Sequence, residues 1–514
     1  SGILLNHPEM ISPISVSSAF IPDNYKIENW NRSSLSELKF SKINPKIAVI
    51  AGYEGIWHST DGGYNFKPLN SGIPNSQYYR KSKSAYIIED SSVHGYLAGT
   101  FGGLFYYDLS KKKWQNILLD KKNEKVVKII DFNGEIAVFT SSNAFVLNKD
   151  LKTISKLELK RDEKETNLTM LELFFQLHTG EIWGLPGKLL FDLVGIILIF
   201  LSFSGLYLWI APNTSKVKLF VKEKSRILKW KGYKWFQKYH LKLGIYSVAV
   251  LLIIGITGFF MRPPAIVMIM DGEIPVKYIP GFKMENPWHD RIRNAMFDSV
   301  SNRLLIDAKD GFWVSSSGNH PIFRRQSPPV PIFAMGATVM QQEANGDYII
   351  GSFSGLFRVS PESGRTIDAL TGEAPYNISP VKPGSNLVTG YFKTPLGDEF
   401  ITTHFGGLMP VYAPLGLNNR FGMPKELERD FTMSMWNYLF EIHNGRIFEF
   451  LVGDFYILII PLSSLLFIIS LVTGVFDWSY LKITSVLHKK RRERSKMIPQ
   501  DRIDISEEIE EKMI

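Results

Sequence analysis

Three long apolar runs interrupt a chain that otherwise alternates between short apolar and polar stretches. The runs cover residues 189–210, 241–261 and 455–476. Each run is long enough to cross about 30 Å of hydrocarbon at about 1.5 Å per residue of helix. The pattern predicts three complete membrane-spanning helices, with two long stretches, 9–165 and 263–430, outside the hydrocarbon.

The two long stretches share a pattern of an apolar strand, a glycine-containing turn and an aromatic-rich strand. Copies lie at residues 50–57, 97–105, 305–313, 349–357 and 401–408, and a degenerate copy without the glycine lies at 138–145. Within each stretch they recur about every 41 to 52 residues, the size of one four-stranded propeller blade. Three copies in each stretch predict an all-β, six-bladed propeller-like domain that is built from both halves of the chain.

The halves also repeat a helix that ends in a histidine. Residues 434–448 match residues 169–183 class for class at an offset of 443 − 178 = 265, and Ser1-Gly2 matches Thr257-Gly258 at an offset of 256. We therefore expect two copies of one ancestral unit. The resulting fold is a four-span helical bundle plus the propeller-like domain, and a first span is expected before residue 1. Duplicated membrane segments commonly build a site between their halves.

These patterns predict a definite order of segments. They are the end of the truncated first span (1–8), blades 1–3 (9–165), an amphipathic helix and the second span (166–212), a basic loop (213–239), the third span (240–262), blades 4–6 (263–430), an amphipathic helix and the fourth span (431–478), and a tail (479–514).

Basic residues predict the orientation. The segment before the third span holds nine of them against the single acid Glu223, namely Lys216, Lys218, Lys222, Lys224, Arg226, Lys229, Lys231, Lys234 and Lys238, and residues 489–492 are all basic. By the positive-inside rule the loop and the C-terminus face the cytoplasm, and the β-rich stretches face the periplasm of a bacterial inner membrane. The net charge of +9 is concentrated in these strips, which suits anionic lipids of the bilayer and gives no support to nucleic acid.

Three histidines could carry chemistry. The chain has no cysteine, which excludes thiol nucleophiles, disulfides, iron–sulfur clusters and covalently attached haem. His178 and His443 lie at the predicted external ends of the second and fourth spans, and His240 opens the third span at the cytoplasmic face. Since two neutral imidazoles can hold haem iron, we predict one or two non-covalent haem b groups with these three residues as axial ligands. Each histidine could instead cap a helix or lie among lipid headgroups.

The remaining histidines give weaker signals. His7 could be an alternative ligand and His404 could lie on a blade face, whereas the others show no metal-site spacing: His58, His94, His289, His320 and His488. By the duplication, the first span should carry one further histidine, about 258 − 240 = 18 residues before Gly2. Residues 59–66 resemble an Asp-box, a hairpin turn that marks a propeller fold and is not an active site.

The segments around His178 resemble the PepSY-associated transmembrane helix family. The resemblance rests on Leu177-His178-Thr179-Gly180, Gly184-Leu185-Pro186-Gly187 and Ser204-Gly205-Leu206-Tyr207-Leu208-Trp209, with weaker similarity around His240 and His443. It implies a bacterial inner-membrane protein of the ferric-siderophore-reductase type, which passes electrons through haem to periplasmic iron. The propeller-like stretches are a departure from the family's usual small external modules.

Two functions from different classes follow. The first is a haem-dependent reductase that takes electrons from a cytoplasmic donor or quinol and delivers them to a periplasmic acceptor, such as a ferric siderophore or a protein. No Gly-x-Gly-x-x-Gly fingerprint indicates a nicotinamide or flavin site. The alternative is a haem-free, membrane-anchored propeller that acts as a receptor or as an assembly or transport accessory. A glycan hydrolase would rest on the Asp-box alone, and no catalytic residue stands out.

Overall fold

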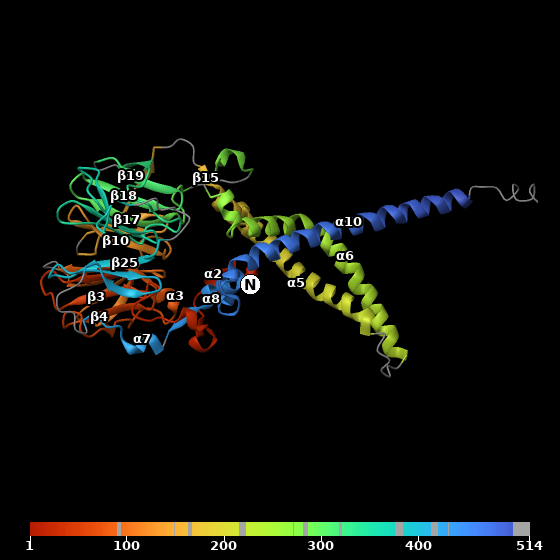
Figure 1. Ribbon diagram of the computed structural model, residues 1–514, viewed down its shortest axis with the longest axis horizontal. Helices are drawn as coiled ribbons and strands as arrows, with labels where there is room; N and C mark the ends of the chain where they lie inside the picture. The colour runs from red at the N-terminus through yellow and green to blue at the C-terminus, as the bar shows by residue number, and fades with distance from the viewer. Residues whose placement is uncertain are drawn as a thin grey trace, which may run out of the picture. The chain divides into compact units, whose positions relative to one another are not determined.

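The computed structural model describes residues 1–89, 94–148, 150–162, 167–214, 223–270, 272–280, 286–317, 321–375, 384–412, 420–429 and 431–496. Lys216, Lys218, Lys222, His320 and the tail beyond residue 496 lie outside the described residues. The chain divides into two compact units (Figure 1). The β-rich unit contains Ser1, Ile3–Thr169 and Glu273–Gly453, and the helical unit contains Gly2, Met170–Gly272 and Asp454–Ile514.

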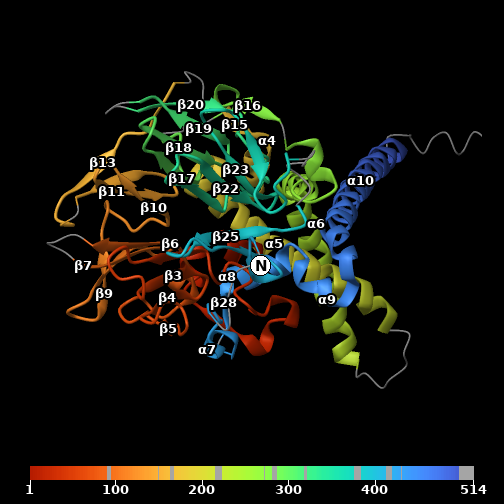
Figure 2. The same cartoon turned by 60° about the vertical axis from the view of Figure 1, so that its left-hand side comes forward.

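Six small sheets, antiparallel apart from one added strand, make up most of the β-rich unit (Figure 2). The first three sheets contain β2 (Glu37–Phe40), β3 (Ala48–Gly52), β4 (Gly55–Ser59) and β5 (Lys67–Pro68); β6 (Ser82–Glu89), β7 (His94–Thr100), β8 (Gly103–Asp108) and β9 (Lys113–Ile117); and β10 (Val126–Phe132), β11 (Glu135–Thr140), β12 (Ala144–Leu147) and β13 (Ile154–Leu157). The other three contain β17 (Ile292–Asp298), β18 (Arg303–Ala308), β19 (Gly311–Ser315) and β20 (Ile322–Gln326); β21 (Val339–Gln342), β22 (Tyr348–Ser352), β23 (Gly355–Val359) and β24 (Thr366–Asp368); and β25 (Val388–Lys393), β26 (Glu399–Thr403) and β27 (Gly407–Pro410).

Each glycine-containing repeat forms the hairpin between the second and third strands of one sheet. In the first sheet β3 pairs with β4, and Gly52 lies opposite Gly55. Gly55 has φ 115°, a conformation that residues with a Cβ rarely adopt, and a Cβ there would lie 2.4 Å from the side-chain oxygen of Asn70. The prediction of a large β-rich domain is therefore confirmed, as a unit of many small sheets.

Neighbouring sheets contact each other through their first strands. β6 packs against β2 and β3, β10 against β6, β17 against β10, β21 against β17, and β25 against both β22 and β2. The hydroxyl of Thr402 donates to the carbonyl of Leu35 at 3.0 Å, which joins the sixth sheet to the chain that leads into the first. The contacts therefore run from the first sheet to the sixth and back to the first.

Three strand pairs join the two long stretches of sequence. β1 (Ser15–Ser17) pairs with β28 (Thr432–Ser434), β15 (Asn167–Thr169) pairs with β16 (Glu273–Pro275), and β14 (Lys160–Arg161) adds to β20 as a parallel strand. Both stretches therefore contribute to one β-rich unit. The unit also holds the short helices α2 (Pro8–Ile11), α3 (Gln77–Arg80), α7 (Lys425–Arg429), α8 (Met435–His443) and α9 (Glu449–Val452).

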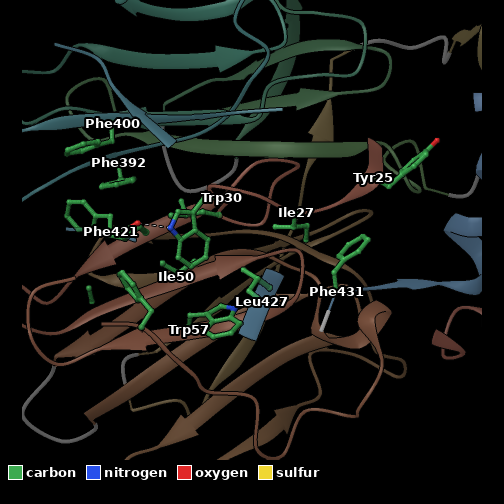
Figure 3. Close-up of a cluster of buried hydrophobic side chains, with 14 of the residues drawn as sticks. Tyr25, Ile27, Trp30, Ile50, Trp57, Phe392, Phe400, Phe421, Leu427 and Phe431 are labelled. Carbon is green, nitrogen blue, oxygen red and sulfur yellow. Dashed lines mark hydrogen bonds between the residues drawn. The ribbon is translucent and has the colours of Figure 1, made fainter. Parts of the chain in front are cut away.

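A cluster of buried aromatic and aliphatic side chains connects the two ends of this unit's sequence (Figure 3). Trp30 is fully buried, and its indole N–H donates to the carbonyl of Phe421 at 2.7 Å. The Phe421 ring lies 5.3 Å from the rings of both Phe392 and Phe400. Such pairs stabilise a fold beyond the burial of their area, so this cluster fastens the first sheet to the sixth.

The Asp-box has the hydrogen bonds that its sequence predicts. The Asp61 carboxylate accepts from the backbone N–H groups of Tyr64 and Asn65 at 3.1 and 3.0 Å, and the Ser59 hydroxyl accepts from the N–H of Gly63 at 2.9 Å. Phe66 is buried against Trp30, with the ring centres 5.9 Å apart. The motif stabilises a turn and contributes to the core.

Three long helices dominate the helical unit (Figure 1). They are α5 (Gly184–Thr214), α6 (Glu223–Phe260) and α10 (Tyr456–Lys496), and α4 (Met170–Thr179) precedes them. Both α5 and α10 pack along α6. Among the described residues, three segments are long and apolar enough to cross a membrane, namely Glu181–Ala211, Lys231–Phe260 and Arg446–Arg491. The three predicted spans thus form helices of the required length and composition, which implies contact with the lipid bilayer.

Two helices extend beyond their predicted ends. Helix α6 begins at Glu223, inside the segment 213–239 that the sequence predicts as a loop, and α10 continues to Lys496, past residue 478. Both extensions are rich in Lys, Arg and Leu, which are good helix formers. The change from apolar to basic residues therefore marks the end of the hydrocarbon and not the end of the helix.

Candidate functional site

His178 lies near the end of α4, where a left-handed glycine terminates the helix. Gly180 has φ 75° and ψ 2°, and a Cβ there would lie 2.6 Å from the carbonyl oxygen of Gly187. Glycine therefore both turns the chain and permits the close approach. The Nδ1 atom of His178 lies 3.0 Å from the Oγ1 atom of Thr257 on α6.

The Thr257 hydroxyl favours one tautomer of His178. Thr257 donates to the carbonyl of Ile253 at 2.6 Å. A hydroxyl that donates elsewhere can accept from an Nδ1–H group, and in that tautomer the lone pair of the neutral imidazole is at Nε2. Metal-ligating histidines are typically oriented by a hydrogen bond from the other ring nitrogen. A Cβ at Gly258 would lie 3.3 Å from Cε1 of His178, so this glycine leaves room for the ring.

His240 has the same kind of partner. Its Nδ1 atom lies 2.8 Å from the Oγ atom of Ser204, a fully buried residue on α5, and Ser204 donates to the carbonyl of Leu201 at 3.2 Å. A Cβ at Gly205 would lie 3.4 Å from Cε1 of His240. A hydroxyl residue followed by glycine thus contacts each of these two histidines, His178 and His240.

The two sites of the helical unit lie at opposite ends of the apolar part of α6. His240 itself is on α6, and His178 is bonded to Thr257, which is 257 − 240 = 17 residues further along. Seventeen residues of helix measure about 26 Å, close to the thickness of the hydrocarbon.

His443 belongs to the β-rich unit, where it is the last residue of α8. The Ser434 hydroxyl caps this helix by accepting from the N–H of Asn437 at 3.2 Å. The Nδ1 atom of His443 lies 3.1 Å from the Oγ atom of Ser1. Burial lowers the pKa of His443, so the ring is neutral near pH 7. The neutral form is the one that binds a metal.

The predicted ligands are therefore divided between the units. His178 and His240 lie in the helical unit and His443 in the β-rich unit, and the pairing of His178 with His443 stays a prediction. Within the described part of the chain, no group of three or more His, Asp or Glu residues could hold a metal ion. Axial ligation of haem needs only two protein ligands, and neutral histidine is a suitable residue type for it.

The weaker candidates have local partners. His7 lies 3.4 Å from the carboxylate of Glu9. The His404 ring packs 5.5 Å from that of Phe353, and burial lowers its pKa to about 4. His404 is thus a neutral side chain of the β-rich interior.

Two sets of functional residues were missed in the sequence. The first set consists of the hydroxyl residues next to the histidines, Ser204, Thr257 and Ser1. Each of them is followed by glycine, and this repeated Ser/Thr-Gly pair is a signal in the sequence that could have identified them. The second is a cluster of cations in the β-rich unit that includes Lys81, Lys83 and Arg293. Its members are far apart in sequence, and no local pattern marks them.

The motif around His178 has a match among known families. The family described as the PepSY-associated TM region matches residues 97–212. The chain carries a PepSY-associated TM region. The matched residues include His178, Ser204 and the whole apolar part of α5. The resemblance predicted from the sequence is confirmed for this region, and the chain is a membrane protein. None of the curated proteins compared matches the chain.

Solved structures show only distant likeness. The extracellular domain of a protein described as a hybrid two component system from B. thetaiotaomicron is 9% identical, with 76% of this chain and 40% of that chain covered and a TM-score of 0.34. PorZ, a surface component of the type-IX secretion system of Porphyromonas gingivalis, is 11% identical, with 73% and 38% covered and a TM-score of 0.33. The chain thus spans about two fifths of the length of these proteins.

Proposed function

We propose that the protein is a bacterial inner-membrane electron-transfer protein that binds one or two haem b groups. It takes electrons from a cytoplasmic donor or from quinol and passes them to a periplasmic acceptor, such as a ferric siderophore complex. One observation carries this proposal: two histidines with hydroxyl-held Nδ1 atoms mark opposite ends of the same membrane-spanning helix.

The residues have separable roles. Thr257 and Ser204 hold the proton at Nδ1, which presents Nε2 of His178 and His240 as the ligating atom. The glycine after each hydroxyl residue lets the imidazole approach the helix backbone. His443, with its matched context, would be the second ligand at the His178 end. Haem iron, when bound, supplies one-electron transfer, and the chain supplies the ligands and the apolar surroundings.

The β-rich unit would face the periplasm, and its six sheets would close into one six-bladed propeller. The closure is supported by the contacts that run from each sheet to the next and from the sixth to the first. It is also supported by the cost of unpaired strand edges, which propellers avoid by completing the circle. The orientation is supported by the basic strips that flank the third and fourth spans, such as residues 489–492.

A haem-free receptor is the second candidate, and one observation favours it. The β-rich unit encloses a cavity of about 460 Å³ that is lined by several cations, which is within the size range of small-molecule sites. In this function the spans anchor the protein, and the propeller-like unit binds the ligand.

An absorbance spectrum separates the two functions. The full natural chain would be expressed with ample haem, purified in detergent, and measured oxidised and reduced. The electron-transfer function predicts a Soret band and the sharpened visible bands of reduced, bis-histidine haem. A variant with His178, His240 and His443 all changed to Ala should lose the bands, whereas a variant with the exposed His94 and His289 changed to Ala should keep them. A wild-type protein without Soret absorbance would leave the receptor function in its place.

A further inference from the structure

A cavity of about 460 Å³ lies among the first strands of the six sheets. Every sheet contributes a residue from its first strand or from the position just before it, namely Ser36, Lys83, Lys128, Arg293, Thr338 and Thr389. The residues after the last sheet that line it are from β28 and α8 and their flanks, and include Glu441 and Arg446. The cavity lies wholly within the β-rich unit.

Some of the cations that line the cavity are neutralised by acids. Lys128 lies 2.8 Å from the carboxylate of Glu37, which lowers the pKa of that buried carboxyl to about 2. Arg446 forms an ion pair with Glu441. These pairs leave the net charge of the cavity to be determined by the other cations.

The other cations are only partly balanced by acids. Among the described residues, Lys81, Lys83 and the neighbouring Lys125 form no ion pair, and Arg293 donates to the backbone carbonyl of Ala334 at 2.8 Å. The buried carboxyl of Asp307 interacts electrostatically with Arg293 and Lys83, and the carboxyl of Asp290 interacts with Lys125. The ammonium of Lys81 lies 4.7 Å from the ring centre of Phe101, and that of Lys125 lies 4.2 Å from the same ring. An aromatic face attracts a cation but does not cancel its charge.

Burial and mutual repulsion lower the pKa values of the lysines in this cluster. Burial, and then the charge of Lys125, lower the pKa of Lys81 to about 8, and burial with the charges of Lys125 and Lys81 lowers that of Lys83 to about 7. A cluster of like charges in a half-enclosed space destabilises the fold unless an anion compensates it. Aromatic rings also line the space, among them Phe101 and Phe353, so the space has an apolar surface beside its charges.

We propose that this cavity binds a small organic anion with at least two negative charges and an apolar part, held by Lys81, Lys83 and Arg293. The volume admits a molecule of ordinary metabolite size. Lys81 and Lys83 lie at the start of β6 and Arg293 lies on β17, and cations from two different sheets suit several negative groups on one molecule. This assignment is independent of whether the histidines hold haem, because none of its residues belongs to the histidine sites.

Calorimetric titration of the full chain in detergent tests the assignment, with benzene-1,3,5-tricarboxylate as the probe. We expect the tricarboxylate to bind at least tenfold more tightly than benzoate or inorganic phosphate, and added salt to weaken it. Lys81→Met and Lys83→Met should each weaken binding at least tenfold, whereas Lys122→Met, which changes an exposed lysine of the same unit, should change it less than twofold. Absence of binding, equal binding of phosphate, or an equal loss with Lys122→Met would overturn the assignment.

Thermal unfolding without any anion separates a binding role from a structural one. Lys83→Met should raise the melting temperature, because it removes a repelling charge from the cluster. The same variant should lose the stabilisation that the tricarboxylate gives to the wild type. A lysine with only a structural role would instead lower the melting temperature when it is replaced, and that result would also overturn the assignment.

Discussion

The two histidine-bearing copies have nearly the same local structure, although they belong to different units. Helix α4 has 10 residues and α8 has 9, and each ends at a histidine or one residue after it. Gly180 and Gly445, two residues after the histidines, both adopt the left-handed conformation, with φ 75° and 80°. The local sequence alone therefore determines this helix end, because two different surroundings leave it unchanged.

The hydroxyl partners also correspond. The duplication aligns Ser1 with Thr257, and these two residues lie 3.1 and 3.0 Å from the Nδ1 atoms of His443 and His178. The same hydroxyl–Nδ1 contact therefore recurs between equivalent residues of both copies, and it orients each ring in a similar way. It supports the view that each copy brings one ligand.

The copies differ by one helical turn between the histidine and the span. Gly184 and Gly453 share an unusual conformation, with φ 65° and ψ −151° against φ 57° and ψ −146°. Their offset is 453 − 184 = 269, four more than the 265 of the histidines. The four-residue helix α9 accounts for the difference. Thr473-Gly474 follows Ser204-Gly205 at the same offset of 269, so the spans correspond once this insertion is recognised.

Replacing either copy's histidine should have the largest effect. If His178 and His443 ligate the same haem, His178→Ala and His443→Ala should each remove the same haem from the spectrum and abolish reduction of a periplasmic acceptor. His240→Ala should remove a different haem, because about 26 Å of helix separate its site from that of His178. Haem content per protein and the reduced-minus-oxidised spectrum measure these losses.

Controls make this comparison decisive. His289→Ala changes an exposed histidine and should leave the haem content unchanged. If His178→Ala and His443→Ala removed different haem groups, the pairing of the two copies would be wrong. If neither variant changed the spectrum of a haem-containing wild type, both histidines would have to be withdrawn as ligands.

Much of the fold could be predicted because its signals are local. The glycine hairpins at residues 50–57 or 349–357 are short sequences whose strand and turn preferences need no distant partner. The parallel addition of β14 to β20 could not be predicted, since it joins residues about 160 positions apart through two short strands. The extension of α6 from Glu223 could not be predicted from apolar length, because basic residues continue the helix beyond its apolar part.

For the candidate site, too, the local signals could be predicted from the sequence and the distant partners could not. The histidines stood out by repetition, but the partner of each depends on how helices pack, and only the recurrent Ser/Thr-Gly pairs hinted at it. The insertion of α9 lies after the histidine repeat, so the offset of the histidines does not reveal it, whereas the offset between Gly184 and Gly453 does. Lys81 and Lys83 became a cluster with Arg293 only through the arrangement of several sheets.

Removing the hydroxyl partners of the histidines should have the next largest effect on haem binding. It tests whether the hydroxyl matters equally in the two copies. Thr257→Val, Ser1→Ala and Ser204→Ala each remove the hydroxyl that lies within hydrogen-bond distance of Nδ1 and leave the histidine in place. We expect each to weaken haem binding by about 10- to 100-fold and to shift the reduction potential of its own haem. Haem titration and redox titration measure the two effects.

A conservative replacement at Thr257 shows whether this residue acts by orienting the imidazole of His178 or only by packing against it. Thr257→Ser keeps the hydroxyl and should restore most of the affinity that Thr257→Val loses. If Ser1→Ala had no effect while Thr257→Val did, the resemblance of the two copies would be limited to their helices.

The unusual glycines should show a smaller effect on stability. At Gly184 and Gly453 a Cβ would meet no atom within 4 Å, so replacement by Ala costs only backbone strain, about 1–3 kcal/mol at each position. At Gly180 the added Cβ would also lie 2.6 Å from a carbonyl oxygen, and Gly180→Ala should therefore destabilise more. Thermal unfolding of the three variants gives the order, and equal losses at all three positions would contradict the role of the close approach.

The smallest expected effect is a pH dependence at His443. Burial depresses the pKa of this residue in the folded state below its usual 6.5. At pH 8 both states are neutral and the residue adds no pH dependence. As the pH falls through 6.5, the unfolded state binds a proton that the folded state does not, so the free energy of unfolding decreases.

In haem-free protein, His443→Gln should lose less stability than the wild type between pH 8 and pH 5.5, whereas the exposed control His289→Gln should follow the wild type. A steeper decline in His443→Gln would mean that protonated His443 is stabilised by a nearby acid, and that this copy is not held ready as a neutral ligand.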